Sequence, residues 1–203
     1  MTAPYRFERD LSALPDYAFG NRSLTWWGII AFMLIEGAAF AMAGGAYFFL
    51  HAHQESWPPP PFQPPGLLPG TLFTIVILLS EIPNTILKRD AEAMRLGTVR
   101  LLLPVMAAIG AILVVIRAFE FGVLNVSWTD NPYGSVMWML LLLHTTHIIT
   151  DWIDTLVLLA LMYTRHGEQP RRFVDTSENS LYWRFVWITW LPIYLLLYWV
   201  PRW

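Results

Sequence analysis

The chain of 203 residues contains no cysteine. A disulfide scaffold is therefore excluded, and so is any zinc or iron–sulfur site that is held by thiolates. A metal bound by this chain would need histidine and carboxylate ligands instead, and 5 histidines and 15 acidic residues are present.

Charged residues are also scarce, since they make up only 14% of the chain while apolar residues make up 56%. So few charged groups cannot cover the surface of a soluble domain of this size, which indicates that the lipid bilayer is part of the solvent. The formal net charge of −2 is small, and it is spread along the chain. A basic face for nucleic acid and an acidic tail are both excluded.

Long apolar segments define the organisation of the chain, because a helix needs about 20 apolar residues to cross the hydrocarbon core. The predicted spans are residues 26–50, 67–87, 101–124, 134–164 and 181–200. Between them lie a proline-rich loop at 56–70, a charged hinge at 88–100, a turn at 130–132 and a polar loop at 165–180. No loop is long enough for a second domain. We therefore expect an all-α membrane protein in which residues 1–203 form one bundle of five transmembrane helices.

Basic residues predict the orientation, because they concentrate in the short cytoplasmic loops of membrane proteins. One side of the predicted bundle carries ten of them: Arg6, Arg9, Arg22, Lys88, Arg89, Arg95, Arg100, Arg165, Arg171 and Arg172. The other side carries only Arg202. The N-terminus is therefore expected in the cytoplasm and the C-terminus outside. Tryptophans near the span ends, including Trp183, are expected at the membrane interfaces.

Ionisable residues inside the predicted spans mark packing or functional positions, because a charge in the hydrocarbon core costs at least about 2.5 kcal/mol. Glu36 lies near the middle of the first span and Glu81 near the inner end of the second. Arg117 and Glu120 lie three residues apart in the third span, so they are expected to pair on one face. Small residues follow Glu36, which predicts close helix packing or a groove for a lipid or a partner.

The fourth span carries the densest polar set, consisting of His144, His147, Asp151 and Asp154. Their spacings of 3, 4 and 3 residues place them on one face of a helix. In one interpretation, this face is half of a metal site that Glu36, Glu81 or Glu120 completes, as in helical di-iron proteins. In the other, the face packs against neighbouring helices, with its histidines bonded to backbone carbonyls or to the intramembrane glutamates. The residues favour the packing interpretation.

Five short motifs occur in a recognisable order. The first span contains IEGAAF, the following loop contains SWPPPPF, and the third span ends with RAFEF. The fourth span contains YGSV and then HTTH, and the last begins with LYWRFVWITW. Together these motifs resemble subunit III of the haem-copper cytochrome oxidases over nearly the whole chain, from Trp26 to Trp199. The resemblance is to the short form of that subunit, which has five helices with the N-terminus inside and the C-terminus outside.

The resemblance implies roles for individual residues. Glu36 matches the buried, carbodiimide-reactive glutamate of the family, and Glu120 matches a second glutamate. His144 and His147 match the family's His-x-x-His pair. In the family these residues line a cleft that holds phospholipid, and none of them binds haem or copper. No catalytic residue and no metal ligand is therefore expected in this chain.

Three positions depart from the family pattern. Thr145 stands where the family usually has glycine, Arg184 where it has histidine, and Trp187 where it has aspartate. The two changes in the last span imply a different contact with a lipid headgroup or an altered partner surface. Arg184 therefore joins the expected set of buried or cleft-lining polar residues.

By this resemblance the chain is an accessory subunit of a proton-pumping terminal oxidase in a bacterial plasma membrane. Subunits I and II would carry the haems and copper and reduce oxygen with electrons from cytochrome c or quinol. This chain would bind phospholipid, stabilise the catalytic subunit and support proton uptake, within the oxidase alone or within a larger respiratory supercomplex. Two alternatives stay open. One is a subunit of a quinol oxidase or of a nitric oxide reductase, and the other is a membrane metalloprotein that uses His144, His147 and the carboxylates.

Overall fold

The structure is a computed structural model that describes residues 17–203. All regular structure within this range is helical, and five of the helices are long and apolar enough to cross a membrane. The predicted fold class, an all-α bundle of five transmembrane helices, is thereby confirmed. Arg6 and Arg9, which contribute to the predicted orientation, lie outside the described residues.

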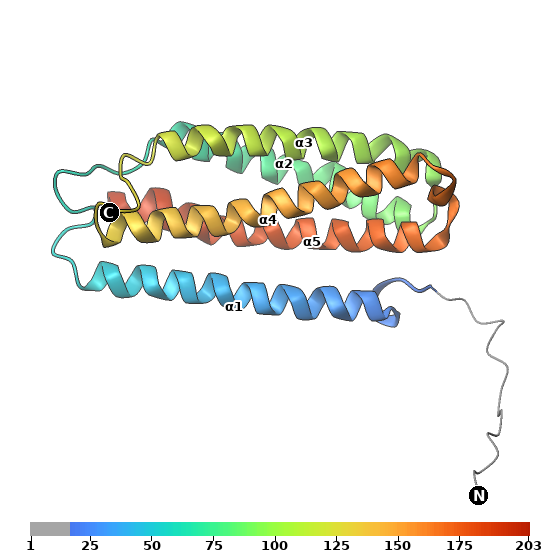
Figure 1. Cartoon of the computed structure of the whole chain (residues 1–203), viewed down its shortest axis with the longest axis horizontal. Coiled ribbons are helices and arrows are strands. Elements are labelled where there is room, and N and C mark those ends of the chain that lie inside the picture. The colour runs from blue at the N-terminus through green and yellow to red at the C-terminus, as the bar shows by residue number, and fades with distance from the viewer. Residues whose placement is uncertain (1–16) are drawn as a thin grey trace, which may run out of the picture.

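The five long helices run side by side and alternate in direction (Figure 1). They are α1 (Leu24–Ala52), α2 (Leu67–Glu92), α3 (Leu96–Gly122), α4 (Pro132–Met162) and α5 (Pro170–Tyr194). A π-helical turn, η3 (Leu195–Trp199), and a 3-10 turn, η4 (Val200–Arg202), continue α5 to the C-terminal end. Short 3-10 turns also lie before α1 (η1, Gly20–Arg22) and before α5 (η2, Arg165–Glu168).

Local sequence signals explain where several helices begin. The side chain of Ser23 accepts a hydrogen bond from the backbone N–H of Thr25 and so caps α1. Asn131 Oδ1 accepts from the N–H of Gly134 at 2.8 Å, and Pro132 occupies the first turn of α4. Proline suits this position because its missing N–H would have no partner in the first turn.

The predicted polar loop at 165–180 is wrong over most of its length, because α5 begins at Pro170. This segment reads as a loop because it is polar. In the structure its polar side chains from Thr176 to Ser180 are buried, and some of them bond to α2 and α4. Asn179 donates to Asp151 at 2.9 Å, and Lys88 donates to Ser177 at 2.9 Å. The neighbouring helices thus supply hydrogen-bond partners to Ser177 and Asn179 that water would otherwise provide.

Two related predictions also need correction. The charged hinge expected at 88–100 is confined to residues 93–95, because α2 continues to Glu92 and α3 starts at Leu96. The sequence predicts Trp183 near a membrane interface, but the earlier start of α5 places it well inside that helix. Its side chain is buried, and its indole N–H donates to Ser80 Oγ at 2.8 Å.

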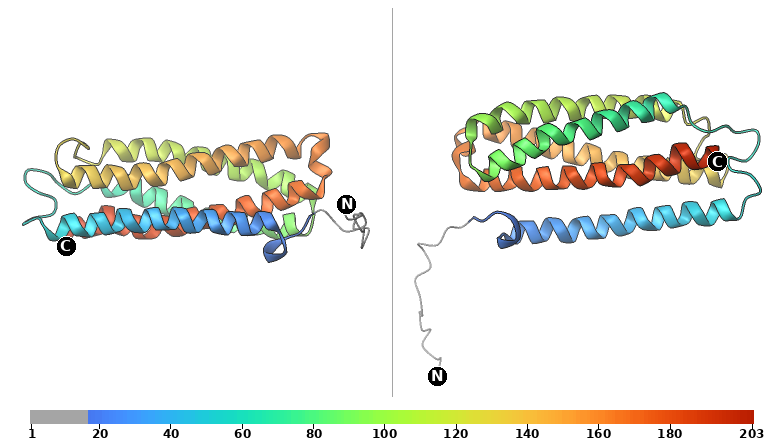
Figure 2. Two further views of the ribbon diagram at one scale, coloured as in Figure 1. Left: turned by 60° about the horizontal axis from the view of Figure 1, so that its bottom comes forward. Right: turned by 180° about the vertical axis from the view of Figure 1, so that it is seen from behind.

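Helices α2, α3, α4 and α5 share one core, and α1 lies against α4 and α5 at one side of it. Figure 1 and the right view of Figure 2 show α1 as the outlying helix. Only Phe40, Ala43 and Tyr47 of α1 are buried. By contrast, the buried side chains of α4 follow one another along its whole length. The two buried tryptophans among the described residues, Trp183 and Trp190, both come from α5.

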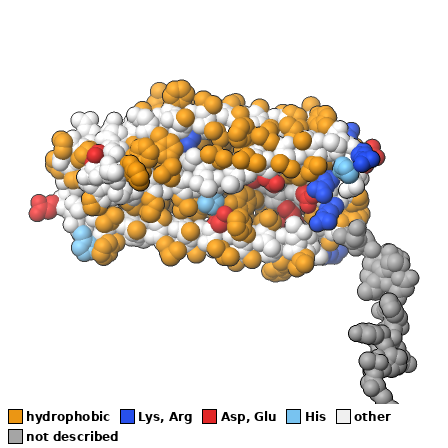
Figure 3. All heavy atoms as spheres, in the orientation of Figure 1, with side chains coloured by type: hydrophobic (Ala, Val, Ile, Leu, Met, Phe, Trp, Pro, Cys, Tyr) orange, Lys and Arg blue, Asp and Glu red, His pale blue; other side chains and the backbone are white. Residues whose placement is uncertain are grey.

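Basic side chains gather at one end of the bundle. This is the end where α2 turns into α3 and where α4 leads into α5, as the face drawn in Figure 3 shows. The C-terminal end of α5 lies at the opposite end, beside the C-terminal end of α1. The uneven distribution that the sequence predicts along the chain is therefore a difference between the two ends of the folded bundle.

Candidate functional site

An ion pair on one face of α3 lies wholly inside the bundle. Arg117 Nη1 donates to Glu120 Oε2 at 2.7 Å, and the two side chains are 1% and 0% exposed. Tyr198 of η3 donates its hydroxyl to the other carboxylate oxygen of Glu120 at 2.5 Å. The predicted local pairing of Arg117 with Glu120 is confirmed.

His144 joins this cluster from α4. Arg117 Nη2 lies 3.0 Å from His144 Nδ1, and His144 Nε2 lies 3.0 Å from the carbonyl oxygen of Val186. A guanidinium only donates and a carbonyl only accepts, so the imidazole carries its proton on Nε2 and accepts at Nδ1. Both ring nitrogens of His144 are therefore occupied, and neither is left to bind a metal.

Aromatic rings enclose the charge of Arg117. Its guanidinium carbon lies 3.8 Å from the centre of the Phe73 ring and 4.3 Å from that of Trp190. Cation–π contacts of this kind stabilise a cation that has lost its water. The whole cluster is buried, which gives it the character of a structural element that joins α2, α3, α4 and α5.

A cavity of about 450 Å³ lies between α1, α4 and α5. Its polar lining consists of Thr25, Glu36, Thr146, His147, Thr150, Asp151, Asp154, Arg172, Asp175, Glu178, Asn179 and Tyr182, and its apolar lining consists of Ile29, Phe32, Val157, Leu158 and Leu161. Figure 3 shows histidine and acidic side chains in the hollow between the helices on this face. The cavity therefore presents carboxylates and aliphatic groups to the same occupant.

Glu36 is the point at which α1 closes the cavity. The hydroxyl of Tyr182 donates to Glu36 Oε2 at 2.7 Å. His147 Nε2 lies 3.1 Å from Glu36 Oε1, close enough for an ion pair when the imidazole is protonated. His147 Nδ1 lies 2.6 Å from the carbonyl oxygen of Leu143 and donates to it. Glu36 and His147 therefore lie together in the cavity wall.

Several buried acceptors in the cavity wall have no hydrogen-bond partner among residues 17–203. Asn179 donates to Asp151 Oδ1 at 2.9 Å and to Asp154 Oδ2 at 3.0 Å. Asp151 Oδ2 and both carboxylate oxygens of Glu178 accept nothing from the described residues. Buried polar atoms are normally bonded, so these oxygens can accept hydrogen bonds from a molecule in the cavity.

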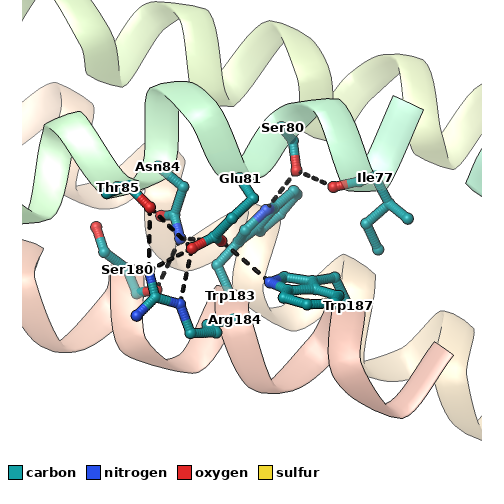
Figure 4. Close-up of polar contacts among 9 residues, drawn as sticks. All are labelled: Ile77, Ser80, Glu81, Asn84, Thr85, Ser180, Trp183, Arg184 and Trp187. Atoms are coloured by element: carbon teal, nitrogen blue, oxygen red, sulfur yellow. Dashed lines mark hydrogen bonds and ion pairs between the residues drawn. The ribbon is translucent and has the colours of Figure 1, made fainter. Parts of the chain in front are cut away.

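A third cluster lies where α2 meets α5 (Figure 4). Glu81 accepts from Nε of Arg184 at 2.7 Å and also from Nη2 of Arg184. The indole N–H of Trp187 donates to the second oxygen of Glu81 at 3.0 Å. The two positions of the last helix that depart from the family pattern therefore hold the same carboxylate.

The predicted polar residues are not brought together at one site. Glu36 and His147 line the cavity, Glu120 and His144 belong to the buried cluster around Arg117, and Arg184 lies at the seam of α2 and α5. Residues 17–203 contain no group of three or more histidine, aspartate or glutamate side chains arranged to hold a metal ion. Both histidines of the fourth helix bond to backbone carbonyls, as the packing interpretation expects, whereas His147, Asp151 and Asp154 line the cavity.

Sequence reasoning misses several residues of these clusters. It assigns Glu178 and Asn179 to a loop, and it singles out neither Tyr182 nor Tyr198. For Glu178 and Asn179, the sequence does contain a signal that they lie in a helix. This signal is Pro170, because proline is common in the first turn of a helix. The tyrosines carry no signal of their own, since their partners Glu36 and Glu120 lie on other helices.

Five spanning helices that enclose charged groups define a polytopic membrane protein. The chain belongs to the cytochrome c oxidase subunit III family, whose model matches residues 17–202. This confirms the resemblance that the five sequence motifs carry.

Relatives named cytochrome c oxidase subunit 3 match most of the chain. The protein from Synechocystis sp. is 25% identical over 190 residues, which cover 88% of this chain and 77% of the relative. The protein from Thermostichus vulcanus is 23% identical over 195 residues, which cover 92% of each chain. The protein from Schizophyllum commune is 27% identical over 180 residues, which cover 84% of this chain and 66% of the relative.

Proposed function

We propose that this chain is an accessory subunit of a proton-pumping haem-copper terminal oxidase that reduces oxygen to water. Its partners are then subunits I and II, which carry the haems and copper, and cytochrome c donates the electrons to the complex. The family match and the names of the relatives support this assignment over a quinol oxidase or a nitric oxide reductase. In this role residues 1–203 act as one membrane domain that stabilises the catalytic subunit.

The cavity between α1, α4 and α5 is the observation that carries the proposed mechanism. Its aliphatic wall suits an acyl chain, and its unpaired carboxylate oxygens and Arg172 suit a polar headgroup. We assign this cavity to a phospholipid that supports the catalytic subunit and proton uptake. Charged and polar side chains at this depth of a membrane raise the free energy unless a bound molecule or a partner offers them polar contacts.

A second groove supports lipid binding on the neighbouring face of α1. It measures about 480 Å³ and is lined by small residues of α1, including Gly37 and Gly44, and by residues of α4 and α5. Cβ atoms placed on these two glycines would already contact Phe185 and Leu196 at 3.8 Å. The small residues of the first span lie close to α5 and η3 and also border an apolar groove, which supports both close helix packing and a place for a lipid chain.

The proposed location is a bacterial plasma membrane, with the N-terminus in the cytoplasm and the C-terminus outside. The basic side chains at one end of the bundle support this orientation. The cavity lining reaches this same end through Thr25, Leu161 and Arg172. A phospholipid headgroup in the cavity would then lie toward the cytoplasmic side.

The test compares two substitutions of Glu36 in the purified oxidase complex. In Glu36→Gln, the amide oxygen still accepts from Tyr182 and the amide N–H can donate to His147 Nε2, so the haem spectrum and most of the initial oxygen consumption should be retained. Glu36→Ala removes the acceptor of a buried hydroxyl, at a cost of about 1–3 kcal/mol, and opens a gap beside the cavity. We expect its activity to decline faster during turnover.

Ile35→Ala is the matched control, because Ile35 is the neighbouring residue and its side chain is 70% exposed. Oxygen consumption followed through sustained turnover should match the unmodified complex in this control. Complete loss of initial activity in Glu36→Gln, or loss of a metal signal, would contradict an accessory role for Glu36. Equal active lifetimes in Glu36→Ala and Ile35→Ala would contradict the role of the cavity.

A further inference from the structure

The carboxylate of Glu81 has no capacity left for a further partner. Besides Arg184 and Trp187, it accepts from the hydroxyl of Thr85 at 2.9 Å and from the amide of Asn84 at 3.1 Å. Figure 4 shows these donors converging on it from α2 and α5. A carboxylate has about four lone-pair sites, so this environment saturates it. A molecule that contacts this cluster from outside therefore finds hydrogen-bond donors and no free acceptor on Glu81.

The unused donors belong to Arg184. Its Nε and Nη2 bond to Glu81, and Nη2 also donates to Thr85 at 3.0 Å. Nη1, with two N–H groups, bonds to none of the residues from 17 to 203. The side chain of Arg184 is 36% exposed at the bundle surface. The cluster thus offers hydrogen-bond donors outward.

These donors lie within the depth of the membrane. Glu81 precedes Lys88 by seven residues of α2, which corresponds to about 10 Å along the helix axis. Lys88 and Arg89 lie in the last turns of α2, at the basic end of the bundle, so Glu81 and Arg184 lie well inside that boundary. Lipid chains offer no acceptor to a guanidinium at such a depth, and an unsatisfied polar group there costs several kcal/mol.

Apolar side chains continue the same surface toward the other end of α5. We define the Arg184 face by Leu78 and Thr85 of α2, by Arg184, Ile188 and Leu191 of α5, and by Leu195 at the start of η3. The last four of these residues follow spacings of 4, 3 and 4, and the three apolar ones among them are exposed. Such spacing forms the seam by which one membrane helix packs along another, and one polar residue in such a seam sets the register.

We propose that the Arg184 face docks a transmembrane helix of a different subunit, which presents a hydrogen-bond acceptor to Nη1 of Arg184. A backbone carbonyl freed by a local break, a hydroxyl or a side-chain amide has the required chemistry. A carboxylate is not required, because Glu81 already balances the charge of Arg184. The acceptor fixes the height at which the partner helix lies against α5.

A second copy of this chain does not fit the Arg184 face. In a symmetric pair the same surface meets itself, so one guanidinium would face another and neither would find an acceptor. The two positions of the last helix that depart from the family pattern, Arg184 and Trp187, both bond to Glu81. The face of this chain is therefore altered as a unit, and the partner helix is expected to match the alteration.

The absence of cysteine in the sequence allows a direct test. Leu191→Cys places a single thiol on the Arg184 face. Ile112→Cys places one on an exposed side of α3 at a similar distance from the outer end of the bundle. Each complex, purified with its partner chains, is treated with a membrane-permeable maleimide before and after the chains are separated in detergent.

Labelling of the Leu191→Cys variant should be slower in the complex by roughly tenfold or more, because reaction then requires local opening of an interface. The Ile112→Cys variant reports whether the reagent reaches thiols at this depth. A benzophenone maleimide attached at the same two positions identifies the neighbour. Crosslinking from position 191 to a different polypeptide supports the proposal.

An unchanged labelling rate for the Leu191→Cys variant overturns the proposal, as does crosslinking from that position to lipid alone or to a second copy of this chain. The inference rests on the proposed function, since both need an assembled oxidase. Failure of the proposed function and failure of the docking inference are distinguishable. Failure of the chain to co-purify with haem-containing subunits counts against the proposed function, whereas free labelling within an intact complex counts only against the Arg184 face.

Discussion

Removal of one member of the Arg117–Glu120 pair should destabilise the bundle far more than removal of both. In Arg117→Met, the aliphatic side chain still fills the space between Phe73 and Trp190. Glu120 however keeps only the hydrogen bond from Tyr198 and becomes an uncompensated buried charge. His144 also loses the donor at its Nδ1.

The expected magnitudes follow from the burial of the pair. Breaking a buried ion pair by removing one partner costs about 3–5 kcal/mol, whereas replacing both partners with neutral groups is often nearly neutral. We therefore expect Arg117→Met to lower the free energy of unfolding by about 3 kcal/mol or more. The double variant Arg117→Met, Glu120→Gln should be more stable than Arg117→Met by about 2 kcal/mol or more, because no uncompensated charge remains and the amide oxygen introduced at position 120 still accepts from Tyr198. It stays less stable than the unmodified chain, because His144 Nδ1 still lacks its donor.

The control is Arg95→Met, which breaks an ion pair between an exposed arginine and the largely buried Asp90. Arg95 is 59% exposed, and its nitrogen lies 3.3 Å from Asp90. Water screens a pair with an exposed partner, so this change should lower the free energy of unfolding by less than Arg117→Met does. Unfolding in mixed detergent micelles, followed by tryptophan fluorescence, measures all the variants on one scale.

The reasoning is refuted if the double variant is as unstable as Arg117→Met, because uncompensated charge would then not be the cause. It is also refuted if Arg117→Met and Arg95→Met have equal effects. The double-mutant comparison is informative because the two groups are in direct contact, and their coupling energy should exceed about 2 kcal/mol.

Two further predictions concern packing and orientation. Gly70→Ala should lower the free energy of unfolding by about 1–3 kcal/mol, because the new Cβ would lie 2.3 Å from the ring of Tyr198 and push its hydroxyl away from Glu120; thermal unfolding in detergent measures this. A topology reporter fused after Trp203 should be read on the outside of the membrane, and one inserted at His166 should be read in the cytoplasm.

Each of these predictions has its own control. Gly97→Ala has open space around the new Cβ, so it should be neutral or slightly stabilising in α3. Equal losses at Gly70 and Gly97 would show that contact with Tyr198 is not the cause. A cytoplasmic signal after Trp203 would reverse the proposed orientation, and signals on one side at both positions would contradict the helix count.

Hydrophobic length makes the membrane fold predictable from the sequence. Each span is a long apolar run, and this property depends on no contact with the rest of the chain. The pairing of Arg117 with Glu120 is predictable for a similar reason, because residues three apart on a helix are neighbours. Predictions that rest on helix geometry alone therefore describe the structure well.

Predictions that depend on neighbouring helices are less complete. The first half of α5 looks like a loop because Ser177, Glu178 and Asn179 are polar, and only the fold reveals that α2 and α4 surround them. His144 and His147 share one face of α4, but His144 contacts Arg117 of α3 and His147 contacts Glu36 of α1. Spacing along one helix cannot reveal which neighbour a side chain meets, so one predicted site is divided into separate clusters.

The position of α1 at the edge of the bundle has a consequence for how the cavity exchanges its contents. Local opening requires the least free energy where the fewest contacts must break, and only Phe40, Ala43 and Tyr47 of α1 are buried. A tilt of this one helix breaks the bond between Tyr182 and Glu36 but leaves the buried ion pair of α3 intact. Movement of α1 alone can therefore open the cavity, while the other four helices keep their packing.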